Sequence, residues 1–241
     1  MIVYVRYGTR LSGKIDSCAG SYVATRFFHI YYIPLIPLSS WLVLGEDRAL
    51  PMPMQWRSVL AGYLRGAISI AAIVLGIQML MFFTNSWRPL DADTIFPEVI
   101  VPLVFVGGAI AGWTYLGRLS KRDRGKRAVY WDAIGYFADP AQLGDARHSL
   151  IEKLRHDVHT RAKALTAANY REQWDPANKW RELAAKPSMN DLDYLKAALT
   201  LCRLEWSFAS GPLRGQLAKD HELIFQNIER HHPKALETQK I

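Results

Sequence analysis

Two long apolar stretches near the middle of the chain constrain its fold more than any other feature. The first covers residues 58–84 and the second covers residues 95–117. Their uncharged cores, Gly66 to Phe83 and Val99 to Gly117, have the roughly 17–25 residues that a helix needs to cross the hydrocarbon of a bilayer. The sequence therefore predicts a membrane protein of mainly α class, built around a two-helix transmembrane hairpin.

The charges around these stretches indicate their orientation. The short loop between them, residues 85–94, contains one arginine and two aspartates, whereas residues 118–127 contain six Lys or Arg and one Asp. Basic flanks stay on the cytoplasmic side of a membrane, so we expect a multi-pass protein with both termini in the cytoplasm, at the inner membrane of a bacterium. The alternative is the mitochondrial inner membrane, with both termini in the matrix.

Residues at the edges of the apolar stretches have expected roles at the membrane interface. Tryptophan and long basic side chains are enriched there, which predicts interface anchors at Trp56, Arg57, Arg65 and Trp87. Small residues one helical turn apart allow helices to approach closely. They predict helix packing, within the hairpin or with another subunit, at Gly62, Gly66, Gly108 and Gly112.

The basic run that follows the second stretch indicates the chemistry of a partner. Residues 128–241 carry sixteen Lys or Arg against fifteen Asp or Glu, so the net charge of +8 arises mainly beside the apolar stretches. This distribution favours anionic lipid over nucleic acid as the basic partner. We expect lipid headgroup contacts at Arg118, Lys121, Arg122, Arg124, Lys126 and Arg127.

The first fifty residues are typical of β-strands. Apolar and β-branched runs at Ile2–Tyr7, Tyr22–Tyr32 and Trp41–Leu44 are separated by glycines and serines, which predicts a small antiparallel module of three to five strands over residues 1–50. The uncharged run Phe27–Leu44 has a competing interpretation as a third membrane span. Its two prolines oppose a regular helix there.

One segment of this module carries a resemblance to known proteins. Residues 27–38 have the pattern F-x-H-x-x-x-I-P-L-I-P-L, with His29 as its histidine. This segment resembles the zinc-ribbon-like or β-barrel-like N-terminal modules of uncharacterised bacterial membrane proteins. The ribbon versions hold a metal through paired C-x-x-C motifs. This chain has no C-x-x-C and Cys18 stands alone, so no metal site is carried over. The resemblance implies no activity.

The remainder of the chain is predicted to be a helical domain over residues 128–232, followed by a flexible tail at 233–241. Apolar residues at helical spacing predict four helices. They begin near Gly144 or Asp145, at Pro176, at Asn190 or Asp191, and after the Ser210-Gly211-Pro212 break. The third is apolar nearly all round, which predicts that it lies at the centre of a small bundle.

Candidate chemistry is sparse in this domain. Imidazole and carboxylate side chains on one helix face form a weak candidate for a metal half-site, at His148, Glu152, His156 and His159. We expect this face to be exposed, and we assign no metal and no cofactor. A possible ligand or partner surface combines aromatic and basic residues, namely Tyr170, Arg171, Trp174, Trp180 and Arg181. No P-loop, H-E-x-x-H or G-x-S-x-G motif occurs.

Three functions fit these patterns. The first is a non-catalytic membrane subunit or scaffold that braces a larger membrane protein complex from the cytoplasmic side, with other membrane subunits and anionic lipids as partners. The second is a membrane-anchored sensor or adaptor whose helical domain binds a soluble partner or ligand. The third is a metal-dependent enzyme at the membrane surface. The first is our expectation, so we do not expect an enzyme.

Overall fold

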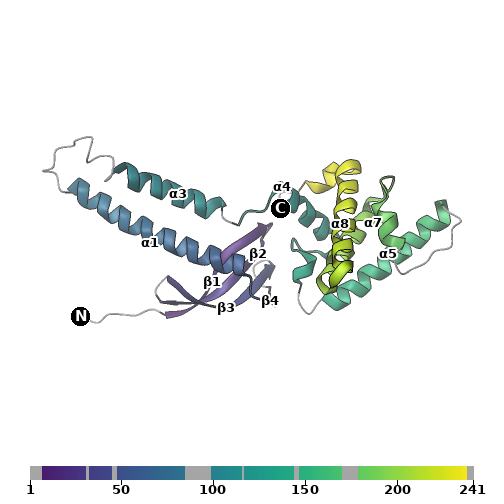
Figure 1. The fold of residues 1–241 in the computed structure, drawn as a ribbon, viewed down its shortest axis with the longest axis horizontal. Coiled ribbons are helices and arrows are strands. Elements are labelled where there is room, and N and C mark those ends of the chain that lie inside the picture. The colour runs from purple at the N-terminus through teal and green to yellow at the C-terminus, as the bar shows by residue number, and fades with distance from the viewer. Residues whose placement is uncertain are drawn as a thin grey trace. The chain divides into compact units, whose positions relative to one another are not determined.

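The computed structural model describes residues 7–30, 33–44, 48–84, 99–115, 117–143, 147–169 and 179–237. Within these residues the chain forms a four-stranded antiparallel sheet and seven α-helices (Figure 1). The fold is therefore mixed α/β, whereas the sequence predicted a mainly α class. The chain divides into two compact units. One combines most of the sheet with the helices α1 and α3, and the other contains the helices α4 to α8.

The sheet is a meander in which each strand pairs with the next one in the sequence. Its order is β1 (Tyr7–Cys18), β2 (Ser21–Ile30), β3 (Ile33–Leu44) and β4 (Ala49–Met52). Side chains of a strand alternate between its two faces, and in β2 the buried set includes Val23, Thr25, Phe27 and His29. This sheet confirms the prediction of a small antiparallel β module, which reaches slightly beyond residue 50.

The run Phe27–Leu44 had two interpretations, as strands and as a third membrane span, and its described part agrees with the strands. Its described residues belong to β2 and β3, and both Pro34 and Pro37 lie within β3. A proline removes a backbone donor and blocks a continuous helix, which is the physical reason why a third helical span does not form here.

Two apolar helices belong to the same unit as the sheet, and they lie side by side in Figure 1. Helix α1 covers Trp56–Thr84 and helix α3 covers Val101–Tyr115. Among the described residues, α1 is the one helix long and apolar enough to cross a membrane, over the 26 residues Trp56–Met81 with a mean hydropathy of 1.8.

Helix α3 is shorter than the sequence predicted. It has 15 residues, preceded by a π-helical turn at Val99 and Ile100, and a membrane span needs roughly 17–25. The expected loop at 85–94, with the expected anchor Trp87, lies outside the described residues. A hairpin that crosses a membrane thus stays a prediction.

The helical unit begins earlier than the sequence predicted. Helix α4 covers Lys121–Ile134 and crosses the expected boundary between a basic segment at 118–127 and a domain that starts at 128. Its N-cap is Ser120, whose hydroxyl accepts a hydrogen bond from the backbone N–H of Asp123 at 3.0 Å. The basic run is therefore the first half of a packed helix.

The other helices lie close to their predicted positions. They are α5 (Arg147–Asn169), α6 (Lys179–Ala185), α7 (Leu192–Phe208) and α8 (Gly211–His231). The expected flexible tail starts instead with a short 3-10 helix, Pro233–Leu236, that packs on α4 and α8. Its last residue lies against Gly125, where an added Cβ would be 3.3 Å from the side chain of Leu236.

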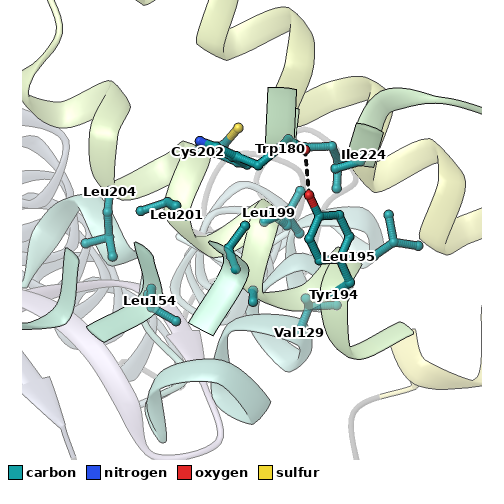
Figure 2. Close-up of a cluster of buried hydrophobic side chains, with 14 of the residues drawn as sticks. Val129, Leu154, Trp180, Tyr194, Leu195, Leu199, Leu201, Cys202, Leu204 and Ile224 are labelled. Carbon is teal, nitrogen blue, oxygen red and sulfur yellow. Dashed lines mark hydrogen bonds between the residues drawn. The ribbon is translucent and has the colours of Figure 1, made fainter. Parts of the chain in front are cut away.

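Helix α7 lies at the centre of this unit, as its apolar surface predicted. Figure 2 shows its leucines pointing into a core that Val129, Leu154 and Ile224 complete. The hydroxyl of Tyr194 donates a hydrogen bond to the carbonyl of Trp180 at 2.9 Å, so this buried polar group is satisfied. Cys202 is fully buried in the same core, and burial raises the pKa of its thiol well above the ordinary value.

Candidate functional site

The start of helix α1 is fixed to the sheet by buried hydroxyl groups. The hydroxyl of Ser58 donates to the carbonyl oxygen of Gly13 at 2.8 Å and accepts from the hydroxyl of Thr25 at 2.9 Å. Thr25 lies 3.1 Å from the hydroxyl of Ser40, which accepts from the backbone N–H of Gln55 at 2.9 Å. Each of these buried polar groups has a partner, so the sheet determines where α1 begins.

Glycines let the sheet and α1 approach closely. Gly13 has φ +72°, and a Cβ added to it would lie 1.9 Å from the backbone oxygen of Ser58. A Cβ on Gly62 would lie 2.8 Å from the ring of Phe27, and one on Gly66 would lie 3.1 Å from Pro34. The contacts of Gly62 and Gly66 are thus with strands, whereas the sequence predicted contacts with a helix.

The other two glycines expected to pack helices lie in α3. A Cβ added to Gly108 would meet nothing within 4 Å. The surroundings of Gly112 lie outside what the structure describes. The glycine pattern of α3 therefore has no described packing role.

Strand β1 also holds the residues that follow α3. The backbone N–H of Asp16 donates to the carbonyl of Gly117 at 2.9 Å, and Ser17 pairs with Arg118 in a parallel bridge. Gly117 has φ +81°, and a Cβ there would lie 2.8 Å from a side-chain carbon of Ile15. A single strand therefore contacts both the start of α1 and the end of the α3 segment.

A cleft of about 1120 Å³ lies between these elements. Its lining includes Tyr7, His29 and Trp113, together with four basic residues: Arg10, Lys14, Arg65 and Arg118. One guanidinium nitrogen of Arg65 donates to the carbonyl of Lys14 at 2.7 Å. Its guanidinium carbon lies 5.7 Å from the centre of the Trp113 ring. Arg65 is thereby held in a defined position between β1 and α3.

The two other described residues expected as interface anchors lie at the start of α1. Trp56 is 72% exposed, and Arg57 is also exposed. Their exposure leaves both side chains accessible to an external surface.

The basic run has three different environments in the structure. Lys121 and Arg124 are exposed, and the guanidinium of Arg118 lies 4.6 Å from the centre of the Tyr115 ring. Arg127 is only 5% exposed and donates to the carbonyl of Phe137 at 3.2 Å. The prediction that Arg127 contacts lipid headgroups is therefore wrong, because its charge is buried within the helical unit.

Two further basic side chains form ion pairs with helix α8. Arg122 pairs with Glu222 and Glu229, and Lys126 lies 3.4 Å from Glu222. Burial tends to raise the pKa of Glu222, but the charges of Lys126 and Arg122 outweigh it and lower that pKa overall. These ion pairs join α4 to α8, and the headgroup contacts of Arg122 and Lys126 stay a prediction.

The residues suggested as a metal half-site lie along α5. His148, Glu152 and His156 are exposed, His159 is partly buried, and Glu152 accepts from Arg155 at 3.5 Å. In the part of the chain that the structure describes, no three His, Cys, Asp or Glu side chains gather as metal ligands would. This face of α5 therefore has no described metal site.

The aromatic and basic residues suggested as a ligand surface are only partly described. Tyr170, Arg171 and Trp174 lie outside the described residues. Trp180 and Arg181 are both buried, 2% and 6% exposed, and Trp180 belongs to the core of Figure 2. These two residues stabilise the bundle and do not line an open surface.

A buried histidine links helices α4 and α8. The hydroxyl of Tyr130 lies 2.8 Å from Nε2 of His221. Burial raises the pKa of Tyr130 well above its ordinary value, so the hydroxyl keeps its proton and donates to the imidazole. Burial, with the nearby charges of Lys126 and Arg203, lowers the pKa of His221 to about 4. His221 is therefore neutral at physiological pH.

This histidine predicts that the helical unit loses stability in acid. The unfolded chain binds a proton on His221 near its ordinary pKa of 6.5, whereas the folded chain binds it only near 4. Between these values the unfolded state holds more protons, so stability falls as the pH falls. Because His221 keeps some contact with solvent, we expect a loss of about 1–2 kcal/mol between pH 7 and pH 5. Thermal melts should show that the His221→Gln variant loses correspondingly less stability over this pH range. Equal losses in the two proteins would contradict the prediction.

The sequence analysis missed the polar cluster of Ser58, Thr25, Ser40 and Gly13. These residues lie far apart in the chain, and a serine or threonine in a strand does not by itself indicate a polar cluster. The one signal was a glycine within an otherwise strand-like segment, which often marks a close backbone approach.

Comparisons with protein-family models, with curated proteins and with solved structures found no match to this chain.

Proposed function

We propose that this protein is a non-catalytic membrane scaffold that braces a larger membrane protein complex. In this proposal α1 and the α3 segment enter the bilayer as a hairpin, and the sheet and the helical unit stay on the side from which both helices enter. The proposed location is a bacterial inner membrane with both termini in the cytoplasm. The mitochondrial inner membrane, with both termini in the matrix, is the alternative.

The observation that carries this proposal is the attachment of both helices to strand β1. Gly13 contacts the start of α1 through Ser58, and Asp16 contacts Gly117 after α3. The two contacts lie three residues apart on the same strand, so one helix begins and the other ends at nearly the same level. That is the arrangement that a membrane hairpin needs.

The surfaces of the two helices support the same proposal. Many apolar side chains of α1 and α3 are exposed, including Ile73 at 63%, Leu80 at 64% and Val104 at 69%. Exposed apolar surface on this scale is unfavourable in water and favourable in hydrocarbon. The cations that remain exposed near the helix ends, Arg57, Lys121 and Arg124, suit the cytoplasmic side of a bilayer.

The helical unit supports a structural role. Several of its partly or fully buried polar side chains are bound to one another or to backbone: His221 to Tyr130, Arg203 to Asp139, and Asn227 to the carbonyls of Ala184 and Lys186. Such groups stabilise one rigid shape, which suits a protein that positions its partners.

The test begins with membrane attachment. We expect the full-length protein to stay in the membrane fraction after washing with alkaline carbonate and to be released by mild detergent. Release by carbonate alone would contradict the proposed hairpin.

A second measurement tests the scaffold role. The protein would be purified in nanodiscs, and everything that remains bound would be identified by mass spectrometry. We expect a fixed set of membrane proteins at constant ratio to it. Recovery of the protein alone, although it stays in the membrane, would contradict the scaffold role. This result would not contradict the proposed hairpin.

A further inference from the structure

We propose that the cleft between β1, α1 and α3 is a binding site for one acidic phospholipid. Of the basic run, Arg118 belongs to the described lining of this cleft, whereas the exposed cations Lys121 and Arg124 do not. This inference rests on the membrane location proposed above, because the ligand is a component of the bilayer.

The charge of the cleft selects an anion. Two basic side chains come from β1, one comes from α1 and one follows α3: Arg10, Lys14, Arg65 and Arg118. Among the described residues that line the cleft there is no Asp or Glu. Basic residues near a membrane surface each attract anionic lipid, and four that face one cleft act on the same headgroup.

The position of Arg65 suits a phosphate group. One of its nitrogens donates to the carbonyl of Lys14 at 2.7 Å, and its guanidinium carbon lies 5.7 Å from the centre of the Trp113 ring. A planar guanidinium held in this way presents paired donors to phosphate oxygens. The cleft therefore offers this guanidinium to the headgroup together with the three other basic side chains that line it.

The apolar part of the cleft selects an acyl chain over a free anion. The α1 residues Ile70 and Ile73 line it and are exposed, as are Ile33 of β3 and Trp113 of α3. Ile70 and Ile73 follow Arg65 along α1, so the apolar part of the lining extends beyond this basic residue toward the C-terminal end of the helix. A molecule with a phosphate at one end and a hydrocarbon chain at the other complements both parts.

The volume of the cleft agrees with a ligand of this size. At about 1120 Å³ it is slightly larger than the roughly 300–1,000 Å³ typical of ligand pockets. A lone phosphate would leave most of this volume and all of its apolar wall unused.

The experiment measures which lipids remain on the purified full-length protein. The protein would be placed in nanodiscs of phosphatidylcholine and phosphatidylglycerol, extracted in mild detergent and analysed by native mass spectrometry. We expect one phosphatidylglycerol to be retained per protein, enriched at least about tenfold over its share of the nanodisc lipid. Retention of the two lipids in proportion to the mixture would overturn the proposal.

A pair of matched variants assigns the site. The first replaces three cleft cations, Arg10→Gln, Lys14→Gln and Arg118→Gln, and leaves Arg65 in place because it supports the junction. The control makes the same change in charge outside the cleft: Arg57→Gln, Lys121→Gln and Arg124→Gln. We expect retention to fall about tenfold or more in the first variant and to change less than about twofold in the control. Equal losses in both would show general attraction to the basic surface and overturn the proposal.

Two further measurements separate the possible failures. Excess inorganic phosphate should leave the retained lipid in place, and its displacement would point to a free anion as the ligand. Both variants and the unmodified protein should resist carbonate washing. A protein that resists carbonate but retains no acidic lipid overturns this inference alone, whereas one that carbonate releases overturns the proposed membrane location.

Discussion

Replacing Gly13 with alanine is expected to destabilise the unit of sheet, α1 and α3 by about 2–5 kcal/mol. Gly13 has φ +72°, which costs an L-residue about 1–2 kcal/mol. In addition, the new Cβ would lie 1.9 Å from the backbone oxygen of Ser58, so α1 must move away from β1. Overpacking of this kind typically costs about 1–3 kcal/mol.

The movement should also break the polar contacts below α1. The hydroxyl of Ser58 bonds to the carbonyl of Gly13 and to Thr25, and both contacts are buried. Thermal melting of the full-length protein in mild detergent, with hydrogen exchange of the β1 amides, measures the effect. We expect faster exchange in β1 together with a lower melting temperature.

Gly8 provides a matched control in the same strand. A Cβ added to Gly8 meets nothing within 4 Å, so Gly8→Ala should change stability by less than about 0.5 kcal/mol. Equal effects of the two substitutions would show that the close approach of β1 and α1 does not occur in solution.

The Asp139→Ala variant is expected to destabilise the helical unit by about 2–3 kcal/mol. The carboxylate of Asp139 accepts two or more hydrogen bonds from Arg203, at 2.8 Å from Nε and 2.5 Å from the terminal nitrogen. Burial tends to lower the pKa of Arg203, but the contacts with Asp139 raise it overall. Loss of the carboxylate leaves a partly buried cation without its main partner. Because the Arg203 side chain is 29% exposed, we expect this cost to lie below the roughly 3–5 kcal/mol known for fully buried pairs.

Asp139 has a second role that the same variant removes. Its carboxylate accepts from the backbone N–H of Ala141 at 3.0 Å and caps the short helix at Pro140–Gln142. The Asp139→Asn variant keeps an acceptor for both contacts. We therefore expect its free energy of unfolding to lie between those of the wild type and the alanine variant. Chemical denaturation, followed by circular dichroism, measures the free energy of unfolding of the three proteins and so gives their order of stability.

An exposed ion pair is the control for this prediction. Glu152 and Arg155 lie 3.5 Å apart on α5, and their side chains are 59% and 44% exposed. Because surface pairs contribute roughly 0–1 kcal/mol, Glu152→Ala should have little effect. A loss for Asp139→Ala no larger than for Glu152→Ala would contradict the structural role of the Arg203 contact.

Local patterns along the chain were sufficient to predict most of the elements. The apolar run of α7 predicted a helix that begins at Asn190 or Asp191. The structure places the N-cap at Asp191, whose carboxylate accepts from the N–H of Tyr194 at 3.0 Å. Pro34 and Pro37 correctly favoured a strand over a helix. These features depend on residues a few positions apart, so the printed sequence contains the information that decides them.

The basic run shows where such patterns were insufficient. A dense cluster of Lys and Arg is equally compatible with a solvated segment and with a helix that pairs with acidic residues. The partners of Arg122 and Lys126 are Glu222 and Glu229, about a hundred positions further along the chain. No local rule connects residues at that separation, and so the helical domain was predicted to begin only at residue 128, without a helix over 121–134.

Hydrophobic periodicity, prolines and capping residues, all visible in the primary structure, determined where this protein has strands and helices and that α1 is apolar enough to cross a membrane. Only the tertiary structure decided that Gly62 and Gly66 receive strand side chains, that Arg127 is buried, and that β1 contacts both α1 and the end of the α3 segment. The physical reason is that element formation depends on neighbouring residues. Packing depends instead on which distant side chains fit together. The presence of a glycine or an arginine at one position does not indicate which distant residue it will contact.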